Sequence, residues 1–154
     1  MPDHETFMRR CIELAHQAAQ SNDTLVGSLI VRDGKIIGEG VEAVKAKCDF
    51  TAHAEIEAIK AACSDLTTTN LSGCILYSTA EPCFMCSYAI RQARITLVVF
   101  GRAAPGVGGV TSAHPILTDA LIKNWNPPPN VVAGVLEKEC WELSGRRTRK
   151  IHRV

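Results

Sequence analysis

Long hydrophobic runs are missing from this chain, although 46% of its 154 residues are hydrophobic. None approaches the roughly 18 apolar residues that a membrane-spanning helix needs. The stretch from Met1 to Glu5 also lacks the basic and then apolar order of an export signal. We therefore expect a cytoplasmic globular protein with no membrane partner. Its seven cysteines, an odd number, are interpreted as reduced thiols or metal ligands and not as a disulfide framework.

Strong charge of either sign is also missing, because the formal net charge is only +1. No global field therefore draws the chain to a polyanion. The exception is a basic tail from about residue 145, where five Lys or Arg residues occur without an acidic one. Such a tail could contact phosphates, but a short polar terminus is more often frayed and solvated. We expect a single domain over residues 1–154.

The hydrophobic pattern predicts alternating helices and strands. Apolar residues at helical spacing predict helices over residues 4–20, 52–63, 82–93, 117–123 and 136–144. Compact apolar runs predict strands over residues 25–31, 35–41, 74–79, 95–100 and 131–135, the first two joined by the hairpin turn Asp33-Gly34. This order implies a three-layer α/β/α sandwich around one mixed five-stranded sheet.

Two short motifs hold the residues of a metal site, His53-Ala54-Glu55 and Pro82-Cys83-Phe84-Met85-Cys86. Pro82 suits the first turn of a helix, where the positive end of the helix dipole lowers the pKa of a thiol. Cys83 and Cys86 are three residues apart and share one face of that helix. With His53 they form a three-ligand set that balances the charge of Zn²⁺ and leaves a fourth position for water, whose pKa falls toward roughly 7.

Glu55 lies two residues after His53, so the two side chains do not share a helix face. We therefore do not expect Glu55 to be a ligand beside His53. It can lean over the helix end toward the water and the substrate ring. That placement suits a general base that takes a proton from water, passes it to a ring nitrogen and then assists the departure of ammonia.

Taken alone, a C-x-x-C pair has other interpretations. It could be a redox pair, which the preceding Glu-Pro disfavours, or half of a structural zinc site. The fourth ligand of such a site could come from Cys63, Cys74 or His114. A solitary His53 would usually be a core histidine. In combination, the two motifs match the H-x-E and P-C-x-x-C signature of zinc-dependent base deaminases, and a non-catalytic zinc module has no need for Glu55.

These motifs and their surroundings resemble the cytidine-deaminase-like superfamily, and within it the group of guanine deaminases, cytosine deaminases and bacterial tRNA adenosine deaminases. The resemblance covers about residues 5–145, and residues 134–140 are similar to the last helix of the tRNA enzymes. Its matching segments are Val26–Val31, Thr51–Ile56, Leu76–Thr79, Glu81–Cys86 and Arg94-Ile95.

The resemblance implies a homodimer with zinc held by His53, Cys83 and Cys86 and with Glu55 as the proton shuttle. It also implies that the backbone N–H of Ala54 holds a substrate carbonyl or ring atom. One position departs from the group, whose members usually carry an asparagine after the second strand to bond the base or its sugar. Glu42 stands at that position here.

Glu42 leaves the substrate open. An ionised carboxylate only accepts hydrogen bonds, so a pocket lined by Glu42 requires N–H or O–H donors on the facing edge of the substrate. Alternatively, Glu42 points to solvent from the end of its strand. In either case the chemistry predicted from the two motifs is unchanged.

We expect a zinc-dependent aminohydrolase that deaminates a free nucleobase, a nucleoside or a related aminated heterocycle of the guanine or cytosine type and releases ammonia. The alternative is a tRNA adenosine deaminase that acts on an anticodon-loop base. We rank this alternative second, because only the tail is basic and a protein that grips RNA usually has a basic face as well. Three aromatic residues could stack on a base, although each is more often core: Phe84, Trp125 and Trp141.

Overall fold

A computed structural model describes residues 3–151, and the side chains of residues 3–144. Its single sheet has the strand order β2-β1-β3-β4-β5. Strands β1 (Gly27–Arg32) and β2 (Lys35–Val41) form the predicted antiparallel hairpin, and β1 also pairs antiparallel with β3 (Ile75–Ala80). On the other side β3, β4 (Leu97–Arg102) and β5 (Asn130–Ala133) are parallel. The predicted mixed five-stranded sheet is therefore confirmed.

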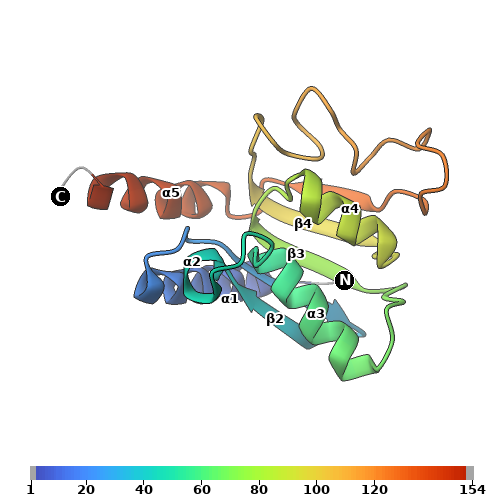
Figure 1. Cartoon of the computed structure of the whole chain (residues 1–154), viewed down its shortest axis with the longest axis horizontal. Helices are drawn as coiled ribbons and strands as arrows, with labels where there is room; N and C mark the ends of the chain where they lie inside the picture. Colours follow the sequence, from blue (N-terminus) through green and yellow to red (C-terminus); the bar gives the residue numbers. More distant parts are fainter. Residues whose placement is uncertain (1–2, 152–154) are drawn as a thin grey trace.

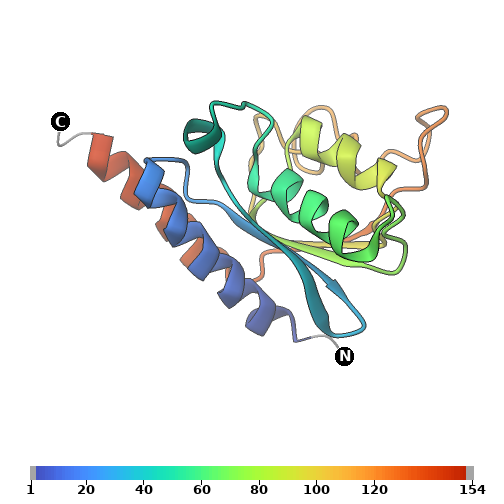
Figure 2. The same cartoon turned by 60° about the horizontal axis from the view of Figure 1, so that its bottom comes forward.

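Helices cover both faces of this sheet (Figures 1 and 2). One face carries α1 (His4–Gln17) and α5 (Glu137–Ile151), which lie side by side, and a 3-10 turn over Ala18–Ser21 follows α1. The opposite face carries α3 (Ala54–Leu66) and α4 (Phe84–Gln92). The short helix α2 (Val44–Lys47) lies between β2 and α3, in a segment for which we predicted neither helix nor strand. Two apolar clusters fill the spaces between the layers, one on each face of the sheet.

Two predictions for the C-terminal third need correction. The last helix runs to Ile151 and not to residue 144, and the side chains of its basic tail lie outside the described ones. The helix predicted over residues 117–123 does not form, and residues 103–129 contain neither helix nor strand. Its first apolar residue, Leu117, is buried, whereas Leu121 is 89% exposed. The carbonyl groups of Ile116 and Asp119 accept hydrogen bonds from the buried guanidinium of Arg91 and not from a following helical turn.

None of the described helices is both long and apolar enough to cross a lipid bilayer. A cytoplasmic location stays a prediction.

The contact between β2 and α3 positions the functional end of α3. Gly40 lies so close to α3 that an added Cβ would be 2.6 Å from the backbone nitrogen of Ala58 and would overlap the carbonyl oxygen of Ala54. The backbone of a helix cannot rotate away from such a clash as a flexible side chain can. A glycine at this position therefore lets the N-terminus of α3 sit directly against the sheet.

We expect Gly40→Ala to lower the free energy of unfolding by about 1–3 kcal/mol, the usual cost of overpacking. Gly106→Ala is the matched control, because a Cβ at Gly106 meets no atom within 4 Å and its change should stay within about 0.5 kcal/mol. Denaturant unfolding of both variants measures the difference. Equal stability of Gly40→Ala and wild type would contradict the tight packing.

Candidate metal and deamination site

The site residues gather where α3 and α4 begin. His53 is the N-cap of α3 with an extended backbone (φ −68°, ψ 152°), and Cys83 is the N-cap of α4. Cys86 follows in the first turn of α4. β2 precedes α3 and β3 precedes α4, and both strands run antiparallel to β1, so the two helices begin at the same end of the sheet. The structure thus brings together the three ligands that the two motifs predict.

The three ligand atoms are close enough to share one ion. They all lie within 4.8 Å of one another, and His53 Nδ1 is 3.5 Å from Cys83 Sγ and 3.6 Å from Cys86 Sγ. Within the described residues this is the one group of three or more potential ligands, and Cys63, Cys74 and His114 are not part of it. A structural site with four protein ligands therefore finds no support.

The pKa shifts of the three residues favour a thiolate at Cys83 beside a protonated imidazole at His53. A hydrogen bond from Cys86 lowers the pKa of the Cys83 thiol to about 4, against the effect of its burial, and His53 adds to the lowering. The same bond and burial raise the pKa of Cys86. The hydrogen bond with Cys83 raises the pKa of His53 to about 9. One thiolate is thus ready to bind a metal, and binding would release the protons still held by Cys86 and His53.

This donor set fits zinc. Thiolates and imidazole are the ligands that zinc shares with other soft or borderline metals. Two thiolates also cancel the double positive charge of the ion in a place where Cys86 is fully buried.

Glu55 lies beside the ligands without being one of them. Its side chain is 4% exposed and belongs to the first turn of α3. Oε1 accepts a hydrogen bond of 2.7 Å from Ser78 Oγ, and Oε2 is 3.5 Å from Cys86 Sγ. Burial raises the pKa of Glu55. A raised pKa makes the carboxyl group hold a proton more readily than an ordinary glutamate, which suits a group that must both accept and deliver a proton.

Glu42 is buried and does not point to solvent. It is 8% exposed, and its Oε1 accepts a 2.9 Å hydrogen bond from the backbone N–H of Ala54. Burial, followed by the nearby charge of Glu55, raises the pKa of Glu42 to about 7. The Ala54 N–H that the resemblance assigns to the substrate is therefore held by Glu42 in the protein alone.

Sequence reasoning missed the role of Glu81 in shaping the site. Its carboxylate is 3% exposed and accepts hydrogen bonds from the backbone N–H groups of Ala104, Val110 and Thr111 and from the Thr111 hydroxyl. These bonds fold the segment after β4 against the Cys83 turn, where Cys83 pairs with Gly108. No spacing rule predicts such a contact, since its donors lie more than 20 residues away.

Phe50 is a second residue that the sequence did not single out. It is 80% exposed, three residues before His53, on the loop between α2 and α3. Of the aromatic residues that we considered for stacking, Phe84 begins α4 beside Cys83, and its ring meets that of His114 at 6.2 Å. The other two lie elsewhere: Trp125 packs on Tyr88 and Arg91, and Trp141 is on α5 under Arg102.

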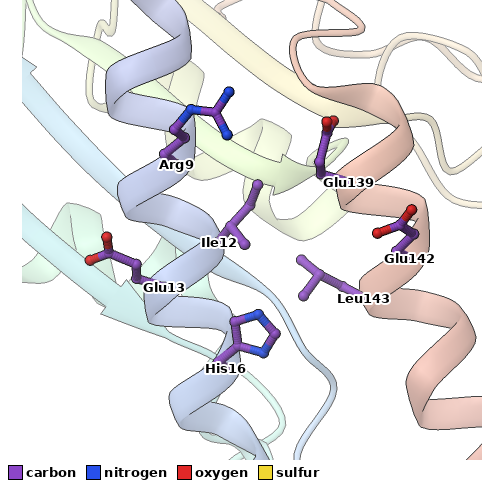
Figure 3. Close-up of a pocket in the computed structure, with 7 residues that line it drawn as sticks. All are labelled: Arg9, Ile12, Glu13, His16, Glu139, Glu142 and Leu143. Atoms are coloured by element: carbon purple, nitrogen blue, oxygen red, sulfur yellow. The ribbon is translucent and has the colours of Figure 1, made fainter.

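A groove between α1 and α5 lies on the other face of the sheet and shares no residue with this site (Figure 3). Its volume is about 300 Å³. Its lining residues are Arg9, Ile12, Glu13, His16, Glu139, Glu142 and Leu143.

The fold and the site together define the class of zinc-dependent hydrolytic deaminases, in which a metal and a carboxylate replace an amino group by oxygen. Residues 1–102 match the model of the cytidine and deoxycytidylate deaminase zinc-binding region. Since that match covers more than half of the chain, the protein belongs to this deaminase family, and zinc is its cofactor. The resemblance given by the two motifs is confirmed.

Individual relatives and solved structures show which deaminases this chain is similar to. The tRNA-specific adenosine deaminase of Aquifex aeolicus is 41% identical over 120 residues, which cover 78% of this chain and 80% of that protein. A solved structure from a study of A-to-I editing by tRNA:A34 deaminases superposes with a TM-score of 0.84 at 33% identity, over 90% of this chain and 98% of the other. Guanine deaminase from Bacillus subtilis gives a TM-score of 0.63 at 42% identity, over 66% of this chain and 65% of its own.

We expect Cys86→Ser to lower the zinc content of the purified protein from about one ion per chain to a small fraction, because a serine hydroxyl stays protonated and cannot supply the second negative charge. Cys48→Ser is the matched control, since Cys48 is exposed and outside the cluster. Metal analysis by plasma mass spectrometry measures both variants. Full zinc occupancy in Cys86→Ser would remove this residue from the ligand set.

Proposed function

We propose that this protein hydrolytically deaminates an adenosine base in tRNA and releases ammonia. The observation that carries the proposal is the similarity to a tRNA:A34 deaminase structure, which has a TM-score of 0.84 at 33% identity over 90% of this chain and 98% of that structure. Guanine deaminase from Bacillus subtilis is similar over 66% of this chain with a TM-score of 0.63, and guanine deaminase from Nitrosomonas europaea is similar over 96% but with a TM-score of 0.75 at only 21% identity. This ordering reverses our ranking of the two substrate classes, which rested on the low net charge of the chain.

Exposed groups at the rim of the site support an RNA substrate. Proteins recognise an unpaired RNA base largely by stacking it on aromatic side chains, and an enzyme that modifies a base must first take it out of its stack. The exposed Phe50 is close in sequence to His53 and suits such stacking. Lys45 and Lys47 lie on α2, beside the same loop, where they can meet phosphates.

The proposed mechanism assigns one role to each site residue. His53, Cys83 and Cys86 would hold zinc, which when bound lowers the pKa of water toward about 7 and so makes it a nucleophile. Glu55 would accept a proton from the attacking water at its carboxylate and deliver it to a ring nitrogen of the base. It would then take the remaining proton of the added hydroxyl group and deliver it to the amino group, so that a carbonyl forms on the ring and ammonia leaves.

Glu42 and Ala54 would contact the substrate. The Glu42 carboxyl already occupies the Ala54 N–H through one oxygen. The substrate would therefore meet the other oxygen of Glu42 or compete for the N–H. The homodimer that the resemblance implies stays a prediction, because the structure holds one chain.

The test is a deamination assay on zinc-loaded protein with a tRNA that has adenosine at the wobble position. Inosine in the digested tRNA is measured by mass spectrometry, and ammonia by a coupled assay. The same tRNA with guanosine at that position is the control, and a second panel holds guanine, cytosine, cytidine, guanosine and adenosine. Inosine formation without turnover of the small molecules supports the proposal, whereas ammonia from a free base alone would replace it with the small-molecule function.

In the same assay we expect Glu55→Gln to keep its zinc and to lose about 10²–10⁴-fold in rate, the usual contribution of a general acid–base group. Asp65→Asn is the control, because Asp65 is exposed and lies at the end of α3 opposite to the site. A rate for Glu55→Gln within about threefold of wild type would exclude Glu55 from proton transfer.

Glu42→Gln tests selection of the substrate. The amide keeps one acceptor oxygen for the Ala54 N–H but replaces the second acceptor by a donor. We expect kcat/KM to fall at least about tenfold, as for loss of one hydrogen bond to a charged group, and the ranking of substrates to change. Glu39→Gln on β2 is the control, since Glu39 is exposed and pairs with Arg10. An unchanged rate and ranking would place selectivity elsewhere, in the segment over residues 101–115.

A further inference from the structure

We infer that Ser78 is a positioning residue for the reaction and holds the carboxylate of Glu55 in the orientation that proton transfer requires. The hydroxyl of Ser78 donates a hydrogen bond of 2.7 Å to Glu55 Oε1. Ser78 is fully buried and contacts Glu55 from a different element of the fold, 23 residues away. No ligand motif includes it.

The backbone of Ser78 is held rigidly. It lies in β3, where it pairs with Ser28 of β1 on one side and with Phe100 of β4 on the other. A residue bonded into the sheet on both sides cannot shift when a substrate binds. Its hydroxyl is therefore a fixed point against which a more flexible side chain can be oriented.

Glu55 needs such a fixed point. The last torsion of a glutamate is broad and roughly two-fold, so packing alone does not decide how its carboxylate is turned. The bond to Ser78 commits Oε1 to the sheet, and Oε2 then faces the metal ligands, 3.5 Å from Cys86 Sγ. A proton carrier held in one orientation reacts faster than one that must find it.

Among the described contacts, the Ser78 hydroxyl donates a hydrogen bond to Glu55 alone. A serine hydroxyl has one proton to donate, and the described contacts give it to Glu55. Its oxygen in turn receives only a long contact of 3.4 Å from the N–H of Ala80. Ser28, which pairs with Ser78 from the neighbouring strand β1, differs in this respect, because its hydroxyl donates to the backbone carbonyl of Tyr77 at 2.6 Å. Of these two buried serines, Ser78 therefore serves the site and Ser28 the sheet.

The decisive comparison is between Ser78→Thr and Ser78→Val. The two side chains have the same shape and add the same volume to a buried position, but only threonine keeps the hydroxyl. We expect Ser78→Val to lower kcat at least about tenfold, as for loss of one hydrogen bond to a charged group, with KM and zinc content unchanged. Ser78→Thr should retain kcat within about threefold, and Ser28→Ala should leave kcat unchanged.

Equal losses of kcat in Ser78→Thr and Ser78→Val would overturn the inference, because volume and not the hydroxyl would then matter. A lowered zinc content in Ser78→Val alone would also overturn it, since the hydroxyl would then serve metal binding. In a Glu55→Gln background, Ser78→Val should cause little additional loss of kcat, because both changes disable the same hydrogen-bonded pair of Ser78 and Glu55. A full further tenfold loss would place the effect of Ser78 outside Glu55.

The inference does not depend on the proposed tRNA substrate, because Glu55 would carry protons for any amino-bearing ring. If a free base is turned over and tRNA is not, the same variants are measured with that base. Crystal structures of zinc-loaded wild type and Ser78→Val give a readout without a substrate. We expect the Glu55 carboxylate to turn away in the variant, and an identical orientation in both would refute the inference.

Discussion

The balance of charge between two thiols and one imidazole is the constraint on which the site depends. Cys83, Cys86 and His53 lie within 4.8 Å of one another, and the lowered pKa of Cys83 and the raised pKa of His53 favour a thiolate beside an imidazolium. A metal ion would displace the protons of Cys86 and His53, and its two positive charges would balance the two thiolates. The arrangement requires α3 and α4 to begin at the same end of the sheet, and the common direction of β2 and β3 on either side of β1 provides this.

Two buried charges then hold the long irregular segment over residues 103–129 against α4. The Glu81 carboxylate receives N–H groups at the beginning of this segment, and the Arg91 guanidinium donates to the carbonyls of Ile116, Asp119 and Asn126 near its end. Both charges flank the turn that carries the cysteines. Backbone groups that would lack partners in an irregular segment are thereby satisfied. A segment without helix or strand is in this way held beside Cys83, where Gly108 pairs with it.

The site residues also divide by how firmly they are held. The ligands and Glu55 sit on helix ends packed against the sheet, whereas Phe50 is exposed on the preceding loop. This division fits a protein that performs one chemistry on a rigid scaffold and recognises its substrate with loop residues.

Local patterns in the sequence were sufficient for the five strands, the four long helices and the choice of His53, Cys83 and Cys86 as residues that could share a metal ion, because hydrophobic period, capping residues and ligand spacing act over a few residues. They failed for residues 117–123, where Arg91 takes the carbonyl groups that a helix would use. They also missed Ser78, Glu81 and the bond between Glu42 and Ala54, whose partners are between 12 and 30 residues apart. Such contacts depend on strand order and on how two helices dock, and only the tertiary structure decides them.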